Sequence, residues 1–181
     1  MLYTSGEMEQ QAVLNTAAKL CAAARTAPKA HGKDTIRTLV LTGEDKNRVA
    51  DKMEEIGTRE LGAEKMPAWF GRDADNVRRS QALVLIGAEK TYRGVGVCGF
   101  CGFGNCAGCK AAGGNCGFAY VDLGIAVGSA VAEAAIDMVD NRIMYSAGKA
   151  AEELYDSNVL WMGVPLSVSG KSIFFDRKPK T

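Results

Sequence analysis

The chain has 181 residues, of which 47% are hydrophobic, a length and composition suited to one folded domain with one core. Its 22 basic and 21 acidic side chains leave a net charge of +1, which excludes the broad positive field of proteins that bind nucleic acid or anionic membranes. Partners are therefore expected to be small molecules or other proteins.

The sequence predicts a cytoplasmic location. The first residues, MLYTSGEMEQ, lack the basic and then apolar pattern of a signal peptide. The most apolar later stretch is interrupted by Asp122, Glu133 and Asp137, so no membrane span is predicted. Because the cytosol keeps thiols reduced, a disulfide framework is the disfavoured interpretation of the cysteines.

The first half of the chain alternates between helical and extended patterns. A capping-box pattern at residues 4–7 precedes apolar side chains at helical spacing and predicts a helix over 7–24. The β-branched run at 35–41 predicts a strand. After it, apolar residues at helical spacing predict a second helix that ends near Gly57 or Gly62.

A short helix, a buried strand and a long helix are predicted in the middle of the chain. Asp73 is predicted to cap a short helix that runs to Arg79, and the apolar residues 82–86 predict a strand. Asp122 is predicted to cap a long helix made largely of glycine and alanine, which lets another backbone approach closely.

The carboxy-terminal third completes an α+β pattern. Residues 141–145 predict a short strand, Ser146 is predicted to cap a helix through about Tyr155, and 159–164 predict a strand that ends before Pro165. The whole chain, residues 1–181, is therefore predicted to form a single α+β domain.

Five of the six cysteines lie in one glycine-rich segment, CGFCGFGNCAGCKAAGGNC. A C-x2-C turn can direct two sulfurs to one centre, while glycines let the backbone bend so that its N–H groups face the sulfurs. Residues 94–118 are thus predicted to be a metal-binding loop inserted in the domain. Its candidate ligands are two C-x2-C pairs and one further cysteine: Cys98, Cys101, Cys106, Cys109 and Cys116.

The spacing favours an iron–sulfur cluster, [4Fe–4S] or [2Fe–2S], with zinc as the alternative. Zinc ribbons separate their C-x2-C pairs by roughly fifteen residues, whereas four residues separate the pairs here. Cys101, Cys106 and Cys109 have the C-x4-C-x2-C spacing of plant-type ferredoxins. Four ligands leave one cysteine spare, and spacing favours Cys116 or Cys98 for that place.

Two groups outside this loop are candidates for holding a phosphate. Gly170, Lys171 and Ser172 offer an N–H, an ammonium and a hydroxyl, without the Walker motif that precedes them in nucleotide-hydrolysing proteins. The second group is basic, and either binds phosphate or is a solvated face: Arg25, Lys29, Lys33 and Arg37. The single histidine, His31, is expected to be exposed.

Most of the chain resembles a family of small prokaryotic proteins described as containing a ferredoxin domain. The similar segments are ARTAPKAHGKD, CGFCGFGNCAGCK, YVDLGIAVGSAV, DNRIMYSAGKAAEEL and GVPLSVSGKSIFFDR. The resemblance implies a bound cluster and names no reaction.

A second resemblance concerns AARTAPKAHGKDTIRTLVLTG, which is similar to the nitroreductase pattern of a helix end, a flavin-contacting loop and a first strand. It implies a homodimer with FMN at the subunit interface, and a central mixed sheet flanked by helices. Lys29 stands where that family has serine. The flavin-binding candidates that follow are Arg25, Pro28, Lys29, Lys33, Gly170, Lys171 and Ser172.

The sequence therefore predicts a redox protein. A nitroreductase-like domain would carry the cluster on its inserted loop and pass electrons to or from FMN or a small-molecule or protein partner. This role requires no side-chain acid or base, and no catalytic residue is assigned. The alternative is a non-enzymatic module in which zinc or a cluster staples the loop for a regulatory or assembly role.

Overall fold

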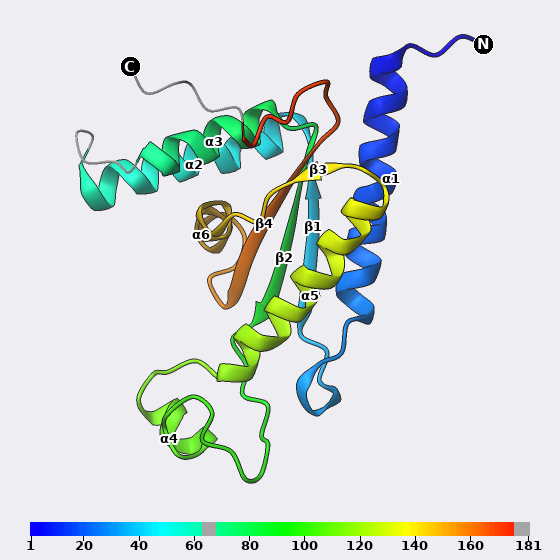
Figure 1. Cartoon of the computed structure of the whole chain (residues 1–181). Coiled ribbons are helices and arrows are strands. Elements are labelled where there is room, and N and C mark those ends of the chain that lie inside the picture. Colours follow the sequence, from blue (N-terminus) through cyan, green and yellow to red (C-terminus); the bar gives the residue numbers. More distant parts are fainter. Residues whose placement is uncertain (63–67, 176–181) are drawn as a thin grey trace.

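The computed structural model describes residues 1–62 and 68–175. Its centre is a four-stranded sheet in the order β1-β2-β4-β3, with helices on both faces (Figure 1). Every pairing among the described strands is antiparallel. The α+β class is thus confirmed, while the sheet is antiparallel rather than mixed. The strands are β1 (Ile36–Leu41), β2 (Ala82–Glu89), β3 (Asp140–Asn141) and β4 (Val159–Ser167).

Strand β2 divides the core into two layers, because its side chains alternate between the faces of the sheet. Val84 and Ile86 pack in the apolar cluster beneath α1 (Ser5–Thr26) and α5 (Gly117–Ile136). Leu83 and Leu85 pack in the other cluster. The helices of that second layer are α2 (Gly43–Leu61), α3 (Ala68–Arg79) and α6 (Tyr145–Leu154).

The predicted capping box at the first helix is confirmed. Thr4 is the N-cap of α1, its Oγ1 accepts from the Glu7 N–H at 3.4 Å, and its own N–H donates to Glu7 Oε2 at 2.7 Å. These two bonds satisfy donors that the first turn of a helix leaves unpaired. The helix extends two residues beyond the predicted bounds at each end, to Ser5 and Thr26.

Three predicted helix caps are instead polar contacts inside the fold. Asp73 lies within α3 and Ser146 within α6, where the Ser146 hydroxyl donates to Asp73 Oδ2 at 2.9 Å. Asp122 lies within α5, whose N-cap is Cys116. Short polar side chains favour N-caps because they can bond a free backbone N–H, but a buried partner on another element satisfies them equally well.

The predicted strand at 141–145 is shorter in the structure, where β3 holds two residues and Met144 pairs with Gly163 as an isolated bridge. Strand β4 continues past its predicted end and includes Pro165. The Gly163 N–H donates to the Met144 carbonyl, so two residues later the nitrogen of Pro165 faces the gap between that bridge and β3. No ladder hydrogen bond is therefore lost to the proline.

Helix α5 is the one described helix that is long and apolar enough to cross a membrane by length and composition. In the structure, 39% of its most apolar window is buried, because it packs along α1 and over the sheet. Its small side chains permit this approach, as the sequence predicted.

Helix α6 lies directly against β4 because a glycine on each element, Gly148 on α6 and Gly163 on β4, leaves room for the other element. A Cβ atom built on Gly148 would lie 1.9 Å from the Trp161 carbonyl oxygen, and one on Gly163 would lie 2.5 Å from the Cβ of Ala147. The backbone of a central strand cannot retreat from such an overlap without breaking sheet hydrogen bonds. Position 148 therefore requires glycine.

We predict that Gly148→Ala lowers the free energy of unfolding by about 3 kcal/mol through this overlap. The matched control is Gly6→Ala, a helical position where an added Cβ meets nothing within 4 Å. Urea unfolding followed by circular dichroism measures both. Equal stability of the two variants would show that α6 does not rest on the Trp161 backbone.

Candidate metal centre

The cysteine-rich segment forms the connection between β2 and α5. It leaves the sheet after Glu89, contains the short helix α4 (Cys106–Ala111), and returns at Gly117. In Figure 1 this connection extends beyond the end of the sheet, at the amino-terminal end of α5. Asn105 caps α4 by accepting the Gly108 N–H at 2.8 Å.

All five cysteines of this connection line one cavity. The cavity has a volume of about 10 Å³, close to the smallest that holds one water molecule. Aromatic rings complete the wall, and they include Tyr92, Phe100 and Phe118. Among the described residues, no three His, Cys, Asp or Glu side chains have the geometry to hold a single metal ion. The five predicted thiols nevertheless lie around one cavity.

Glycines allow the tight course of this connection. Gly102 and Gly104 have positive φ angles of 84° and 72°, as expected from their place in the cysteine segment. Gly108 serves a different purpose: a Cβ there would lie 2.7 Å from the Phe103 carbonyl oxygen. A Cβ on Gly114 would lie 3.1 Å from Cys109 Sγ. Glycine at positions 108 and 114 therefore lets the backbone pack closely against Phe103 and the Cys109 sulfur.

The environment of the thiols differs from one cysteine to the next. Hydrogen bonding by the Phe103 N–H lowers the pKa of Cys101, and the Gly117 N–H and the Cys109 thiol also bond its sulfur. Burial raises the pKa of Cys109 to about 11, and the contact with Cys101 acts in the same direction. Cys101 is thus the thiol of this pair that ionises more readily. Backbone N–H groups face its sulfur, as the sequence predicted.

Tyr92 lines the cavity and anchors the connection. Its hydroxyl donates to the Gly114 carbonyl at 2.9 Å. Burial raises the pKa of Tyr92, and nearby thiols raise it further: those of Cys109, Cys116, Cys101 and Cys106. The phenol is therefore neutral, with its hydroxyl hydrogen available as a donor at physiological pH.

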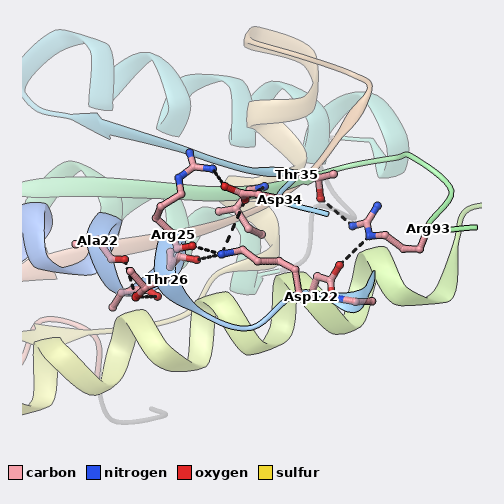
Figure 2. Close-up of polar contacts among 12 residues, drawn as sticks. Ala22, Arg25, Thr26, Asp34, Thr35, Arg93 and Asp122 are labelled. Carbon is pink, nitrogen blue, oxygen red and sulfur yellow. Dashed lines mark hydrogen bonds and ion pairs between the residues drawn. The ribbon is translucent and has the colours of Figure 1, made fainter. Parts of the chain in front are cut away.

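A buried ion pair fixes the start of the connection to α5. Arg93 is fully buried, and its Nε donates to Asp122 Oδ2 at 2.8 Å (Figure 2). The other guanidinium nitrogens donate to the Thr91 carbonyl and hydroxyl and to Thr35 Oγ1, at 2.8 to 2.9 Å. Asp122 Oδ1 accepts the Ala30 N–H at 2.9 Å. Every charged atom of the pair thus has a partner, which burial requires.

We predict that Asp122→Asn lowers the free energy of unfolding by about 3 to 5 kcal/mol, because it leaves the Arg93 charge buried without its counter-ion. The control is Asp75→Asn, which removes an exposed helical acid 3.6 Å from Arg79, and exposed pairs contribute at most about 1 kcal/mol. Urea unfolding compares the two. The double variant Arg93→Met/Asp122→Leu should lose less stability than Asp122→Asn, and the opposite ranking would contradict this account.

The basic candidates at the end of α1 are engaged within the chain. Arg25 Nη1 pairs with Asp34 Oδ2 at 2.6 Å (Figure 2). Lys29 Nζ donates to the carbonyls of Ala24 and Arg25, and only 9% of its side chain is exposed. A cation at these carbonyls complements the negative end of the helix dipole. Lys29 therefore stabilises the carboxy-terminal end of α1. Pro28 and Lys33 are exposed.

The other phosphate candidates lie at the far end of the sheet. Gly170 and its neighbours follow the end of β4, where Leu166 pairs with Ala82, while the Lys29 loop adjoins the end where Ile36 pairs with Ala88. Strand β2 has eight residues and so separates the two groups by about 25 Å within one chain. Ser172 Oγ is buried and, within the described residues, has no hydrogen-bond partner.

His31 and the Arg93–Asp122 pair were not predicted as parts of this region. His31 is exposed, as expected, yet its Nδ1 lies 3.0 Å from the Arg93 carbonyl oxygen, and its backbone has a positive φ of 57°. The sequence holds one signal for the pair, which is an acidic residue inside a long apolar segment. This signal can be interpreted only together with Arg93, which lies 29 residues earlier in the chain.

Comparison with other proteins identifies relatives at two levels. Residues 112–177 match the profile of a family described as "Uncharacterized protein containing a ferredoxin domain". The chain is also 46% identical over 191 aligned residues to an uncharacterized protein of Archaeoglobus fulgidus, covering 99% of this chain and 100% of that protein. The second of these similarities includes the whole cysteine connection.

Solved structures share the fold at low sequence identity. A nitroreductase with bound FMN from Desulfitobacterium hafniense DCB-2 has a TM-score of 0.55 and 13% identity, over 94% of this chain and 81% of that chain. A BluB-like flavoprotein from Clostridium difficile 630 has a TM-score of 0.58 and 16% identity, over 92% of this chain and 84% of that chain. These similarities confirm the predicted nitroreductase-like fold.

Proposed function

Because the chain belongs to the family of proteins described as containing a ferredoxin domain, we propose that it is a redox protein. In this proposal the cysteine cavity holds an iron–sulfur cluster, and the nitroreductase-like domain binds FMN. The observation that carries the proposal is that five thiols from one short connection line a single cavity. The family and the shared fold both favour redox chemistry.

The donor set fits a cluster. Thiolates are the usual ligands of iron–sulfur clusters, and N–H groups directed at the sulfurs stabilise their negative charge. Here the Phe103 and Gly117 N–H groups lower the pKa of the Cys101 thiol, and Cys116 lies at the amino-terminal end of α5, where the helix dipole favours an anion. When bound, a cluster supplies single electrons, and a flavin exchanges one electron or two.

The flavin candidates fit in part. Ser172 has a buried hydroxyl without a partner among the described residues, so it is suited to bind a phosphate oxygen. Arg25 and Lys29 do not fit as phosphate ligands, because Asp34 and the carbonyls at the end of α1 already bind them. We propose that the loop at residues 28–33 contacts the flavin through its backbone and exposed side chains.

A second copy of the chain would complete this flavin site. The two candidate groups lie at opposite ends of one sheet, so one flavin can meet both only if they come from different chains. The outer face of α5 supports such a dimer: of its charged residues, Asp122 is buried and Glu133 is half-buried. Exposed residues four apart run along this face, namely Tyr120, Gly124, Gly128, Ala132 and Ile136, and Ile125 and Ala135 beside them are also exposed.

We predict that Gly128→Arg converts a dimeric protein to a monomer, because it places a charge where the two α5 helices would meet. The control, Ser157→Arg, adds the same charge at an exposed position after α6, in the layer on the opposite face of the sheet. Light scattering after size-exclusion chromatography measures the mass. A monomeric parent protein that nevertheless binds FMN would contradict the proposed interface.

The cofactor proposal is tested on the full chain purified without oxygen. We expect brown protein with equal amounts of iron and acid-labile sulfide, and free FMN fluorescence after denaturation. Replacement of all five cavity cysteines by alanine should abolish the iron and sulfide, whereas Cys21→Ala, on α1, should retain them.

Two outcomes would contradict the proposal. Colourless protein that contains stoichiometric zinc would instead support a stapled, non-redox module. Iron that persists after removal of all five cysteines would place the centre elsewhere. The flavin result is independent, because the five-alanine variant should still release FMN on denaturation.

A further inference from the structure

We propose that four of the five thiols hold the cluster, namely Cys101, Cys106, Cys109 and Cys116, and that Cys98 is a free thiol at the rim. This inference rests on the proposed function and assigns its ligands. Spacing alone left Cys116 and Cys98 as equal candidates for the spare position. The structure distinguishes them, because Cys116 adjoins a packed helix and Cys98 does not.

Helices position three of the four thiols. Cys106 is the first residue of α4, and Cys109 lies one turn later on the same helix. Residues spaced by three on a helix share a face, so these two sulfurs lie on one side of α4. Cys116 is the N-cap of α5, which the Arg93–Asp122 pair fixes to the sheet. The positions of these three thiols are therefore set by packed elements.

Close backbone contacts bring these elements together. Cys109 is fully buried, and its thiol lies 3.5 Å from the carbonyl oxygen of Asn115, the residue before Cys116. A Cβ on Gly114 would lie 3.1 Å from the Cys109 sulfur. The turn between α4 and α5 is thus folded against Cys109, which holds Cys109 and Cys116 on the same side of the cavity.

Cys101 joins this group from the other side. It lies close to Gly117, the first residue of α5. A Cβ on Gly117 would lie 3.5 Å from the Cys101 nitrogen and 2.9 Å from the Phe100 ring. The backbone at Cys101 therefore packs against the start of α5, beside Cys116.

Cys98 is partly buried, as are Cys101 and Cys106, but none of the close backbone contacts described above reaches it. Val97, its neighbour, is fully exposed, and Gly99 is also exposed. Within the described residues, no hydrogen bond reaches its sulfur, and it belongs to no helix or strand. Cys98 thus lines the cavity from a segment that lies outside every described helix and strand.

The ligand set defines a spacing of C-x4-C-x2-C-x6-C. Its first three cysteines are those that match plant-type ferredoxins in spacing. The fourth ligand follows after a short turn instead of a long intervening segment. A cluster bound in this way would join α4 to the N-terminus of α5 and leave one thiol within reach of solvent.

The test replaces each cysteine separately by alanine in the full chain, purified without oxygen. We expect Cys98→Ala and the control Cys21→Ala to keep the iron and sulfide content and the electron paramagnetic resonance spectrum of the reduced parent. Each of the other four variants should lose iron or show a changed spectrum. Loss of the cluster in Cys98→Ala, or an unchanged cluster in any of the four, would overturn the assignment.

A second measurement on the parent protein covers the case in which a variant fails to fold. Iodoacetamide is added to the cluster-loaded chain, and alkylated cysteines are mapped by mass spectrometry. Cys98 should be modified while the four ligands are protected, and all five should react after the cluster is removed under denaturing conditions. Protection of Cys98 together with modification of a proposed ligand would refute the assignment. Parent protein without iron would instead refute the proposed function itself.

Discussion

The ion pair between Arg93 and Asp122 is the contact on which the cysteine end of the molecule depends. It connects the residues after β2 to the middle of α5, and the same carboxylate binds the Ala30 N–H. Two buried charges are tolerated only where hydrogen bonds satisfy both groups. The start of the cysteine connection, the loop after α1 and helix α5 are therefore held in one arrangement.

This pair also places the two proposed cofactor regions beside each other. Tyr92 forms part of the cavity wall, whereas the carbonyl of the next residue, Arg93, contacts the His31 ring in the loop proposed to meet the flavin. Two consecutive residues thus contact both regions.

The separation of the phosphate candidates is the reason for proposing a second copy of the chain at the flavin site. One sheet holds the Lys29 loop at one end and Ser172 at the other, while α5 leaves an uncharged face exposed between them. A buried hydroxyl that has no partner in the part of the chain the structure describes, and an apolar helical face, are both unfavourable in water. Contact between two copies of the chain, with a ligand at the interface, would relieve both.

The sequence by itself determined the local features. The Thr4 capping box, the continuous apolar run of β2 and the cysteine spacing are patterns among residues close in the chain, so they could be recognised directly. The tertiary structure decided the antiparallel sheet, the separation of Lys29 from Ser172, and the internal roles of Asp73 and Asp122. Each of these depends on a partner distant in sequence, such as Arg93 for Asp122, and local periodicity carries no information about that partner.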